Sequence, residues 1–236
     1  MKVNTTSNHS EAIFLSRWPR FFAVASCIFI GIFLLLPSSL LLSTLFTLFF
    51  SAFIYTGRCL WKPLGTWGGA ANAITALRTL GILLLLFFQA ELPPAAFFVV
   101  GILILIADGL DGYYARKYNT VSAFGDLFDK ETDAFFVLAF CIILIKKELI
   151  GMWVVWPALL RYIFVLVLHT FRIQHIVLSY SFRRQFIGMW FMGTIMACFV
   201  LPRPVYTAGM IFATAMLAYS FMKDTFLMLK LKSDQG

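Results

Sequence analysis

Eight apolar runs dominate this sequence and restrict the folds open to it. They are Phe21–Pro37, Leu40–Tyr55, Ile74–Phe88, Ala95–Ala107, Ala134–Ile145, Met152–Leu168, Phe186–Leu201 and Val205–Leu229. Only 13% of the residues are charged and 61% are hydrophobic, whereas about 25% are charged in a soluble domain. Apolar runs of this kind are typical of helices that cross a bilayer and pair their own backbone groups. The sequence therefore predicts an all-α integral membrane protein with eight transmembrane helices.

Several of these runs are shorter than the roughly twenty residues of a full span and must borrow polar flanks, above all the two shortest. We expect the run Ala95–Ala107 to continue as a helix to Tyr118, and the run Ala134–Ile145 to begin near Phe124. Both extensions pass through polar sequence, so polar side chains should lie on membrane helices there.

The net charge of +8 would suit a nucleic-acid partner, but the distribution of the charges argues against one. With Met1 in the cytoplasm, the outer loops receive only Lys146, Lys147 and Arg203, and the inner loops collect most other basic residues. This asymmetry is the positive-inside pattern of membrane proteins. It predicts that both termini are cytoplasmic and that the protein has no nucleic-acid partner. The expected location is a membrane such as the bacterial inner membrane.

Four carboxylates lie close together in the polar stretch between the two short runs: Asp108, Asp111, Asp129 and Asp133. A charged carboxylate deep in hydrocarbon costs roughly 2.5–3.5 kcal/mol on insertion scales. Within each pair, Asp108 with Asp111 and Asp129 with Asp133, the side chains lie one helical turn apart. Left alone, the four would repel one another and take up protons, whereas divalent cations between two facing helices would compensate them. We therefore expect a metal site.

The residues around the four carboxylates follow the pattern D-x2-D-G-x2-A-R-x8-G-x3-D-x3-D from Asp108 to Asp133. This pattern resembles the signature of the CDP-alcohol phosphotransferase family, integral membrane enzymes that make phospholipids. The resemblance implies a six-helix catalytic core over 72–236. Residues 1–71 would then add two extra transmembrane helices and an interfacial connector, and would form a separate N-terminal segment.

The family resemblance also implies roles for individual residues. Asp108, Asp111, Asp129 and Asp133 would hold two divalent ions, Mg²⁺ or Mn²⁺, and Asp133 would also act as the general base. The implied nucleotide-binding residues are Asn72, Thr75, Arg78, Gly112, Ala115, Arg116 and Gly125. Glycines let a nucleotide approach the backbone closely, and the planar fork of an arginine suits a diphosphate.

Several of these assignments have plainer alternatives. Asn72 and Thr75 would serve equally well as helix caps, with Arg78 reaching toward the membrane surface. Arg116 would also fit as a positive-inside anchor. For the acceptor, family members that use phosphorylated alcohols suggest Arg161, Arg172, Arg183 and Arg184. The alternative for Arg161 is a structural ion pair with an aspartate.

The function implied by the resemblance is phospholipid synthesis. The phosphatidyl group of CDP-diacylglycerol would pass to an alcohol or phospho-alcohol, with release of CMP. A magnesium-dependent membrane prenyltransferase also binds diphosphate through paired aspartates, but it does not account for Gly112, Ala115, Arg116 and Gly125 at these spacings. A divalent-cation transporter should carry polar residues on several spans. A homodimer is a further expectation left open.

Overall fold

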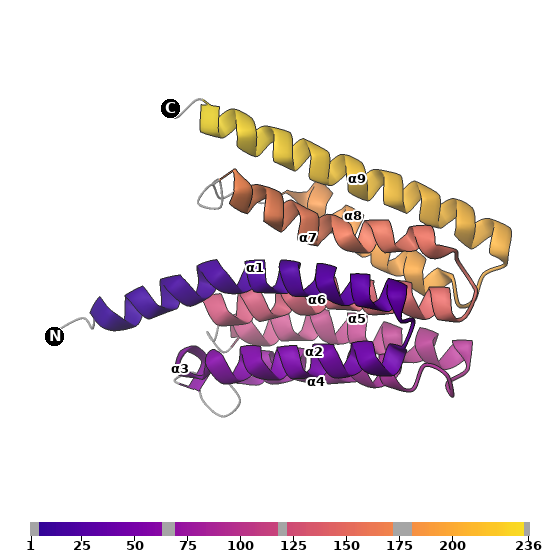
Figure 1. The fold of residues 1–236 in the computed structure, drawn as a ribbon, viewed down its shortest axis with the longest axis horizontal. Coiled ribbons are helices and arrows are strands. Elements are labelled where there is room, and N and C mark those ends of the chain that lie inside the picture. Colours follow the sequence, from indigo (N-terminus) through magenta and orange to yellow (C-terminus); the bar gives the residue numbers. More distant parts are fainter. Residues whose placement is uncertain (1–4, 63–68, 118–121, 172–180, 234–236) are drawn as a thin grey trace. The chain divides into compact units, whose positions relative to one another are not determined.

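The computed structural model describes residues 5–62, 69–117, 122–171 and 181–233, and the described residues are helical almost throughout, with no strand among them. In chain order the helices are α1 (Thr5–Leu35), α2 (Ser39–Thr56), α3 (Arg58–Trp61), α4 (Gly69–Phe87), α5 (Pro94–Lys117), α6 (Ala123–Lys146), the 3-10 helix η3 (Met152–Val154), α7 (Val155–Thr170), α8 (Phe182–Ala197) and α9 (Arg203–Ser233) (Figure 1). The protein is therefore an all-α integral membrane protein, as the sequence predicts.

Each of the eight predicted apolar runs falls largely on a helix of its own in the described chain. The two extensions through polar sequence are confirmed, because α5 runs to Lys117 and α6 begins at Ala123. In both cases the helix continues through the acidic motif and gains the length that its apolar run lacks. The polar residues of the motif therefore lie on regular helices.

Five helical segments of the described chain are long and apolar enough to cross a membrane: Ile13–Leu35, Ser39–Thr56, Gly69–Phe87, Met152–Thr170 and Arg203–Lys232. In α5 only Pro94–Leu110 is apolar, and it is shorter than these spans. Helix α6 carries the acidic residues of the motif, and α8 has 16 residues. That α5, α6 and α8 also cross the membrane, which would give eight crossings in all, thus remains a prediction.

The chain divides into two compact units, of which the first comprises Met1–Glu91 and Val100–Phe136. Within it, α2 and α4 lie side by side (Figure 1). Aromatic side chains of α2 also contact α6: the ring centroids of Phe46 and Phe135 are 4.6 Å apart, and those of Phe53 and Phe124 are 5.1 Å apart. Helix α2 therefore packs with α4 and α6, and the predicted boundary between 1–71 and 72–236 stays a prediction.

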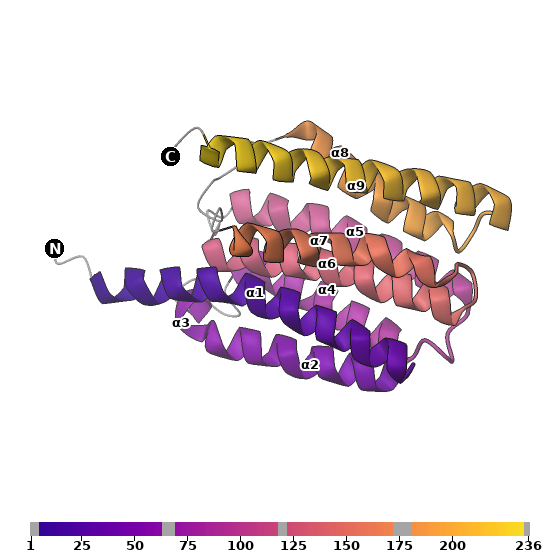
Figure 2. The same ribbon diagram turned by 45° about the horizontal axis from the view of Figure 1, so that its top comes forward.

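The second unit comprises Leu92–Val99 and Val137–Gly236. Helices α8 and α9 lie beside each other in both ribbon views (Figure 2). Pro202 lies in the short turn between them, where its ring cannot continue a helix. The hydroxyl of Tyr206 at the start of α9 donates a hydrogen bond of 2.9 Å to the carbonyl of Leu149, which fixes this end of the helix pair.

Candidate metal centre

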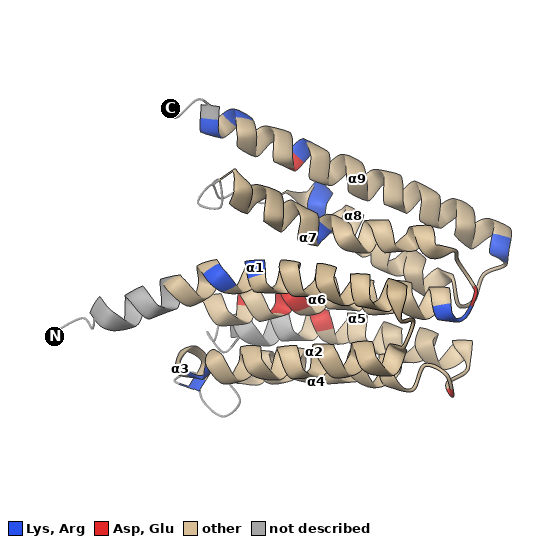
Figure 3. Cartoon of the chain, in the orientation of Figure 1, with Lys and Arg blue, Asp and Glu red and all other residues tan. Residues whose placement is uncertain are grey.

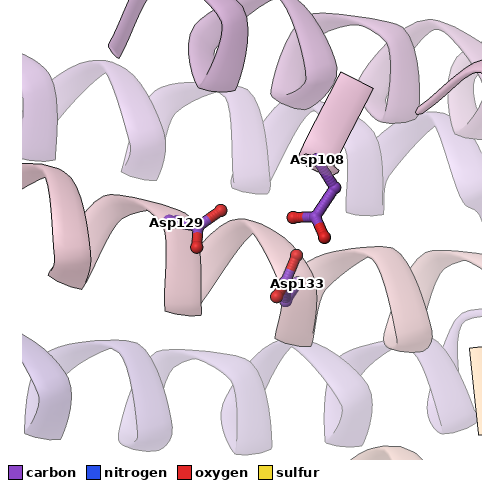
Figure 4. A group of neighbouring side chains, drawn as sticks. All are labelled: Asp108, Asp129 and Asp133. Atoms are coloured by element: carbon purple, nitrogen blue, oxygen red, sulfur yellow. The ribbon is translucent and has the colours of Figure 1, made fainter. Parts of the chain in front are cut away.

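Three of the four predicted ligands come together in the first unit. Asp108 lies on α5, and Asp129 and Asp133 lie one turn apart on α6, with their carboxylates directed toward a shared space (Figure 4). Each side chain offers one oxygen, and these oxygens all lie within 4.8 Å of one another. The expected meeting of two acidic helices is confirmed for these three residues.

The guanidinium of Arg78 on α4 lies among the three carboxylates. Its Nη2 is 2.7 Å from Oδ1 of Asp108 and 2.6 Å from Oδ1 of Asp133, while its Nη1 is 2.7 Å from Oδ1 of Asp129. The Arg78 side chain is 2% exposed, but the exposed fractions of the three aspartates are between 34% and 39%. The cluster is therefore closed on the arginine side and open on the carboxylate side.

The composition of the cluster suits a hard divalent cation. Three carboxylates face one guanidinium, so an excess of negative charge remains, and oxygen-only donors are the ligands that Mg²⁺ and Mn²⁺ prefer. Mg²⁺ binds oxygen at about 2.0–2.1 Å, which puts opposite ligands about 4.2 Å apart. The three oxygens lie within 4.8 Å of one another, so small rotations of these short side chains would bring them to one ion. The residues present fit a metal ion.

The face of α4 that carries Arg78 is polar and buried. Asn72, Thr75 and Arg78 are 6%, 3% and 2% exposed. The next residue, Thr79, shares a hydrogen bond of 2.9 Å between its hydroxyl and that of Thr132 on α6. The prediction that Asn72, Thr75 and Arg78 share one face of a helix is therefore confirmed. The guanidinium of Arg78 turns into the acidic cluster.

Gly125 has a direct packing reason to be glycine. A Cβ atom at this position would lie 2.7 Å from Oδ1 of Asn72 and 3.1 Å from Oγ of Ser122. Ser122 also accepts a hydrogen bond of 3.0 Å from the Gly125 amide at the start of α6. The missing side chain lets α6 approach Asn72 on α4, so two of the predicted nucleotide-binding residues lie next to each other.

The remaining motif residues, Asp111, Gly112, Ala115 and Arg116, lie in the last turns of α5. Their side chains lie outside the described part of the structure, so their predicted roles stay predictions.

Two further charged residues of α6 have different environments. Lys130 pairs with Asp126 one turn earlier, at 2.6 Å between Nζ and Oδ2, and both side chains are exposed. Glu131, by contrast, is 2% exposed. Figure 3 shows the acidic segments of α6 on a set of otherwise mostly uncharged helices. Lys130 and Asp126 therefore form an exposed pair, whereas Glu131 is buried within the bundle.

The predicted acceptor-binding arginines belong to the second unit. One of them, Arg172, lies outside the described residues. Arg161 lies within α7 and is partly buried. Arg183 at the start of α8 donates to the hydroxyl of Ser220 at 2.9 Å and to the carboxylate of Asp224 at 2.5 Å, both on α9. Arg184 lies 3.9 Å from the other oxygen of Asp224.

Sequence reasoning missed two ion pairs in the described chain. One joins Arg78 to the three motif aspartates, and the other joins Arg183 to Asp224, which is 6% exposed. A buried cation calls for a nearby carboxylate, so Arg78 within an apolar run was a usable signal. Asp224, which lies amid the apolar residues of α9, was a second usable signal.

Comparison with known proteins assigns the family. The CDP-alcohol phosphatidyltransferase family model matches residues 69–231, which is more than half of the chain. The chain therefore belongs to the CDP-alcohol phosphatidyltransferase family, and the predicted resemblance is confirmed.

Curated relatives match a shorter stretch. The CDP-diacylglycerol–glycerol-3-phosphate 3-phosphatidyltransferase of Rickettsia typhi is 39% identical over 67 residues, which make up 28% of this chain and 38% of the relative. The Bacillus subtilis protein of the same name is 43% identical over 65 residues, or 26% of this chain and 34% of the relative. The chain thus matches little more than a third of the length of these relatives. No solved structure shows a significant match.

Proposed function

We propose that this protein transfers the phosphatidyl group of CDP-diacylglycerol to an alcohol or phospho-alcohol. The acceptor hydroxyl oxygen bonds to the phosphorus that carries diacylglycerol, the bond from that phosphorus to the bridging oxygen breaks, and CMP leaves. The observation that carries the proposal is the meeting of Asp108, Asp129 and Asp133 from two helices, within the motif of a family of this activity.

We assign the metal to the motif carboxylates. Asp108, Asp111 and Asp129 would hold Mg²⁺ or Mn²⁺, with Asp133 as a further ligand. Two bound divalent ions would neutralise the charge on the transferred and leaving oxygens and lower the pKa of the attacking hydroxyl. The three described carboxylates support this role, because they carry more negative charge than Arg78 offsets.

Asp133 is the proposed general base. It would accept the proton of the acceptor hydroxyl while that oxygen attacks phosphorus, a contribution that is typically worth 10²–10⁴-fold in rate. Its partly exposed carboxylate supports access from the open side of the cluster. Its position one turn from Asp129 keeps it within reach of the same substrate.

The nucleotide would be bound by Asn72, Thr75, Arg78, Gly112, Ala115, Arg116 and Gly125. The contact between Asn72 and the site of Gly125 supports a shared role for α4 and the start of α6. Arg78 and Arg116 would contact the diphosphate, since a guanidinium can form paired hydrogen bonds with phosphate oxygens.

The acceptor is proposed to carry a phosphate bound by Arg161, Arg172, Arg183 and Arg184. The names of the curated relatives make glycerol 3-phosphate the first acceptor to test. The sequence around the second aspartate pair, DKETD, departs from the D-P-x-A-D-K pattern common in phosphatidylglycerophosphate synthases. Other phospho-alcohols therefore belong in the same screen.

The active site is proposed to face the cytoplasm, with both termini on that side of a bacterial inner membrane. The protein is also proposed to work as a homodimer. The lopsided distribution of basic residues supports the sidedness. A cytoplasmic site also gives soluble acceptors and metal ions direct access.

The proposal is tested by an acceptor screen with purified protein in detergent. CDP-diacylglycerol and Mn²⁺ would be combined with glycerol 3-phosphate, inositol phosphate, serine, choline or ethanolamine, and CMP and the lipid product would be measured. We expect a phosphatidyl product with at least one phosphorylated acceptor. Release of diphosphate from a prenyl donor, or metal uptake into vesicles without CMP release, would favour the prenyltransferase or the transporter instead.

A further inference from the structure

We propose that Arg78 is a built-in counter-ion of the acidic cluster, which holds the three carboxylates together before a divalent ion binds and weakens the affinity for that ion. Metal binding is then an exchange of one cation for another. This inference rests on the proposed function, because it concerns the same carboxylates.

The contacts of Arg78 carry the first step. One guanidinium reaches Asp108 on α5 and both Asp129 and Asp133 on α6, at 2.6–2.7 Å in each case. It therefore links three helices through a single side chain. The Arg78 side chain is almost completely buried, so a water molecule or another side chain cannot readily take its place.

Charge repulsion gives this link its importance. Three ligand oxygens lie within 4.8 Å of one another, and like charges at such separations repel strongly inside a protein. A cation in contact with all three removes most of this repulsion. Without Arg78, the metal-free cluster would lose its compensating charge, and the two acidic helices would separate or take up protons.

The same charge acts against a metal ion. A divalent cation bound to these oxygens would lie close to the guanidinium, and the two positive charges would repel each other. Removal of Arg78 should therefore strengthen metal binding, even though it destabilises the metal-free protein. A purely structural arginine, or one that helps to build the metal site, would have the opposite effect on metal affinity.

Removal of Arg78 could also disorder the carboxylates, but this should not turn the predicted gain in metal affinity into a loss. Asp108, Asp129 and Asp133 are short side chains on regular helices, and they have few rotamers to lose. Once a metal has taken over the carboxylates, the guanidinium can turn its N–H groups to the diphosphate. Arg78 would then act first as the counter-ion of the metal-free carboxylates and, after metal binding, as a ligand of the nucleotide diphosphate.

The test measures Mn²⁺ affinity of the purified protein by electron paramagnetic resonance and thermal unfolding with and without Mn²⁺, in detergent and without nucleotide. For Arg78→Gln we expect binding at least about tenfold tighter, equal to roughly 1.4 kcal/mol, a lower melting temperature in EDTA and a larger rise in melting temperature on metal addition. Arg183→Gln is the matched control, since it breaks the other arginine–aspartate pair, and should leave Mn²⁺ affinity unchanged.

Arg78→Lys keeps the test decisive if Arg78→Gln does not fold. Lysine retains the charge but loses the fork, so we expect a lower melting temperature in EDTA with Mn²⁺ affinity within about threefold of the wild type. Unchanged or weaker Mn²⁺ binding by Arg78→Gln, or tenfold weaker binding by Arg78→Lys, would overturn the inference. CMP release by the wild-type protein decides the proposed function separately, so the two claims can fail independently.

Discussion

Phe53 of α2 stacks on Phe124 of α6 with ring centroids 5.1 Å apart and an angle of 9° between the ring planes. Phe50 and Phe53 also contact Phe128, one turn further along α6. Asp129 and Asp133 belong to the same helix. A helix outside the family match thus packs directly on the helix that supplies two carboxylates of the candidate metal centre.

This packing predicts that the N-terminal helices support the site. Phe53→Ala should destabilise the protein by roughly 0.5–3 kcal/mol, because it removes a fully buried ring and leaves a cavity against α6. Leu48→Ala, at an exposed position of the same helix, is the control. The two variants would be compared by thermal unfolding in detergent, and equal melting temperatures would contradict a supporting role for α2.

The helices were predictable because each apolar run has one stable solution in a membrane, a helix with all its backbone groups paired. The extension of α5 and α6 followed from the length that a span requires. An arginine within an apolar run signals a carboxylate partner, but periodicity could not show which one, since Asp129 and Asp133 lie 51 and 55 residues away from Arg78 along the chain. Local periodicity shows which residues share a helical face, but not which faces of distant helices meet.

The acidic motif shows the same division between local and distant information. Its spacing groups four aspartates, Asp108, Asp111, Asp129 and Asp133, and the structure brings together the three whose side chains it describes. Spacing did not reveal that Gly125 is required by the side chain of Asn72 on another helix. Nor does spacing separate the buried Glu131 from its exposed neighbours Lys130 and Asp126, because all three are charged residues of the same short stretch.

A variant of Asp133 separates the base from the ligands. Asp133→Asn cannot accept a proton but keeps an oxygen, so turnover should fall by about 10²–10⁴-fold while CDP-diacylglycerol binding is largely kept. Equilibrium binding and single-turnover CMP release would be measured on the same preparation. A loss of substrate binding as large as the loss of turnover would identify Asp133 as mainly a metal ligand.

A variant of Arg161 tests the proposed acceptor pocket. If Arg161 binds the acceptor's phosphate, Arg161→Ala should raise the KM for the phospho-alcohol by about ten- to a hundredfold, since a charge-assisted contact is worth roughly 1.5–3 kcal/mol. The KM for CDP-diacylglycerol should change little. Arg161→Lys serves as the conservative control and should recover part of the effect. Equal changes in both KM values would instead indicate a structural role.

The orientation in the membrane can be tested by cysteine accessibility. Single cysteines near Ser38 and Pro94 should react with an impermeant reagent from outside, and cysteines near Arg58 and Asn119 should react only from the cytoplasmic side. This sidedness follows from the asymmetry of the basic residues. Labelling with the opposite pattern would place the acidic motif on the outer face and would rule out the proposed access of cytoplasmic substrates.

The most direct test of the central claim is metal-dependent release of CMP from CDP-diacylglycerol by the purified protein. We predict release with Mg²⁺ or Mn²⁺ and an accepted alcohol, none in EDTA, and a loss of at least about a hundredfold in Asp108→Asn and Asp129→Asn with the fold intact. Lys130→Gln, which changes an exposed charge on the same helix, should retain activity. Full activity in EDTA, or a near-normal rate for Asp129→Asn, would contradict the account.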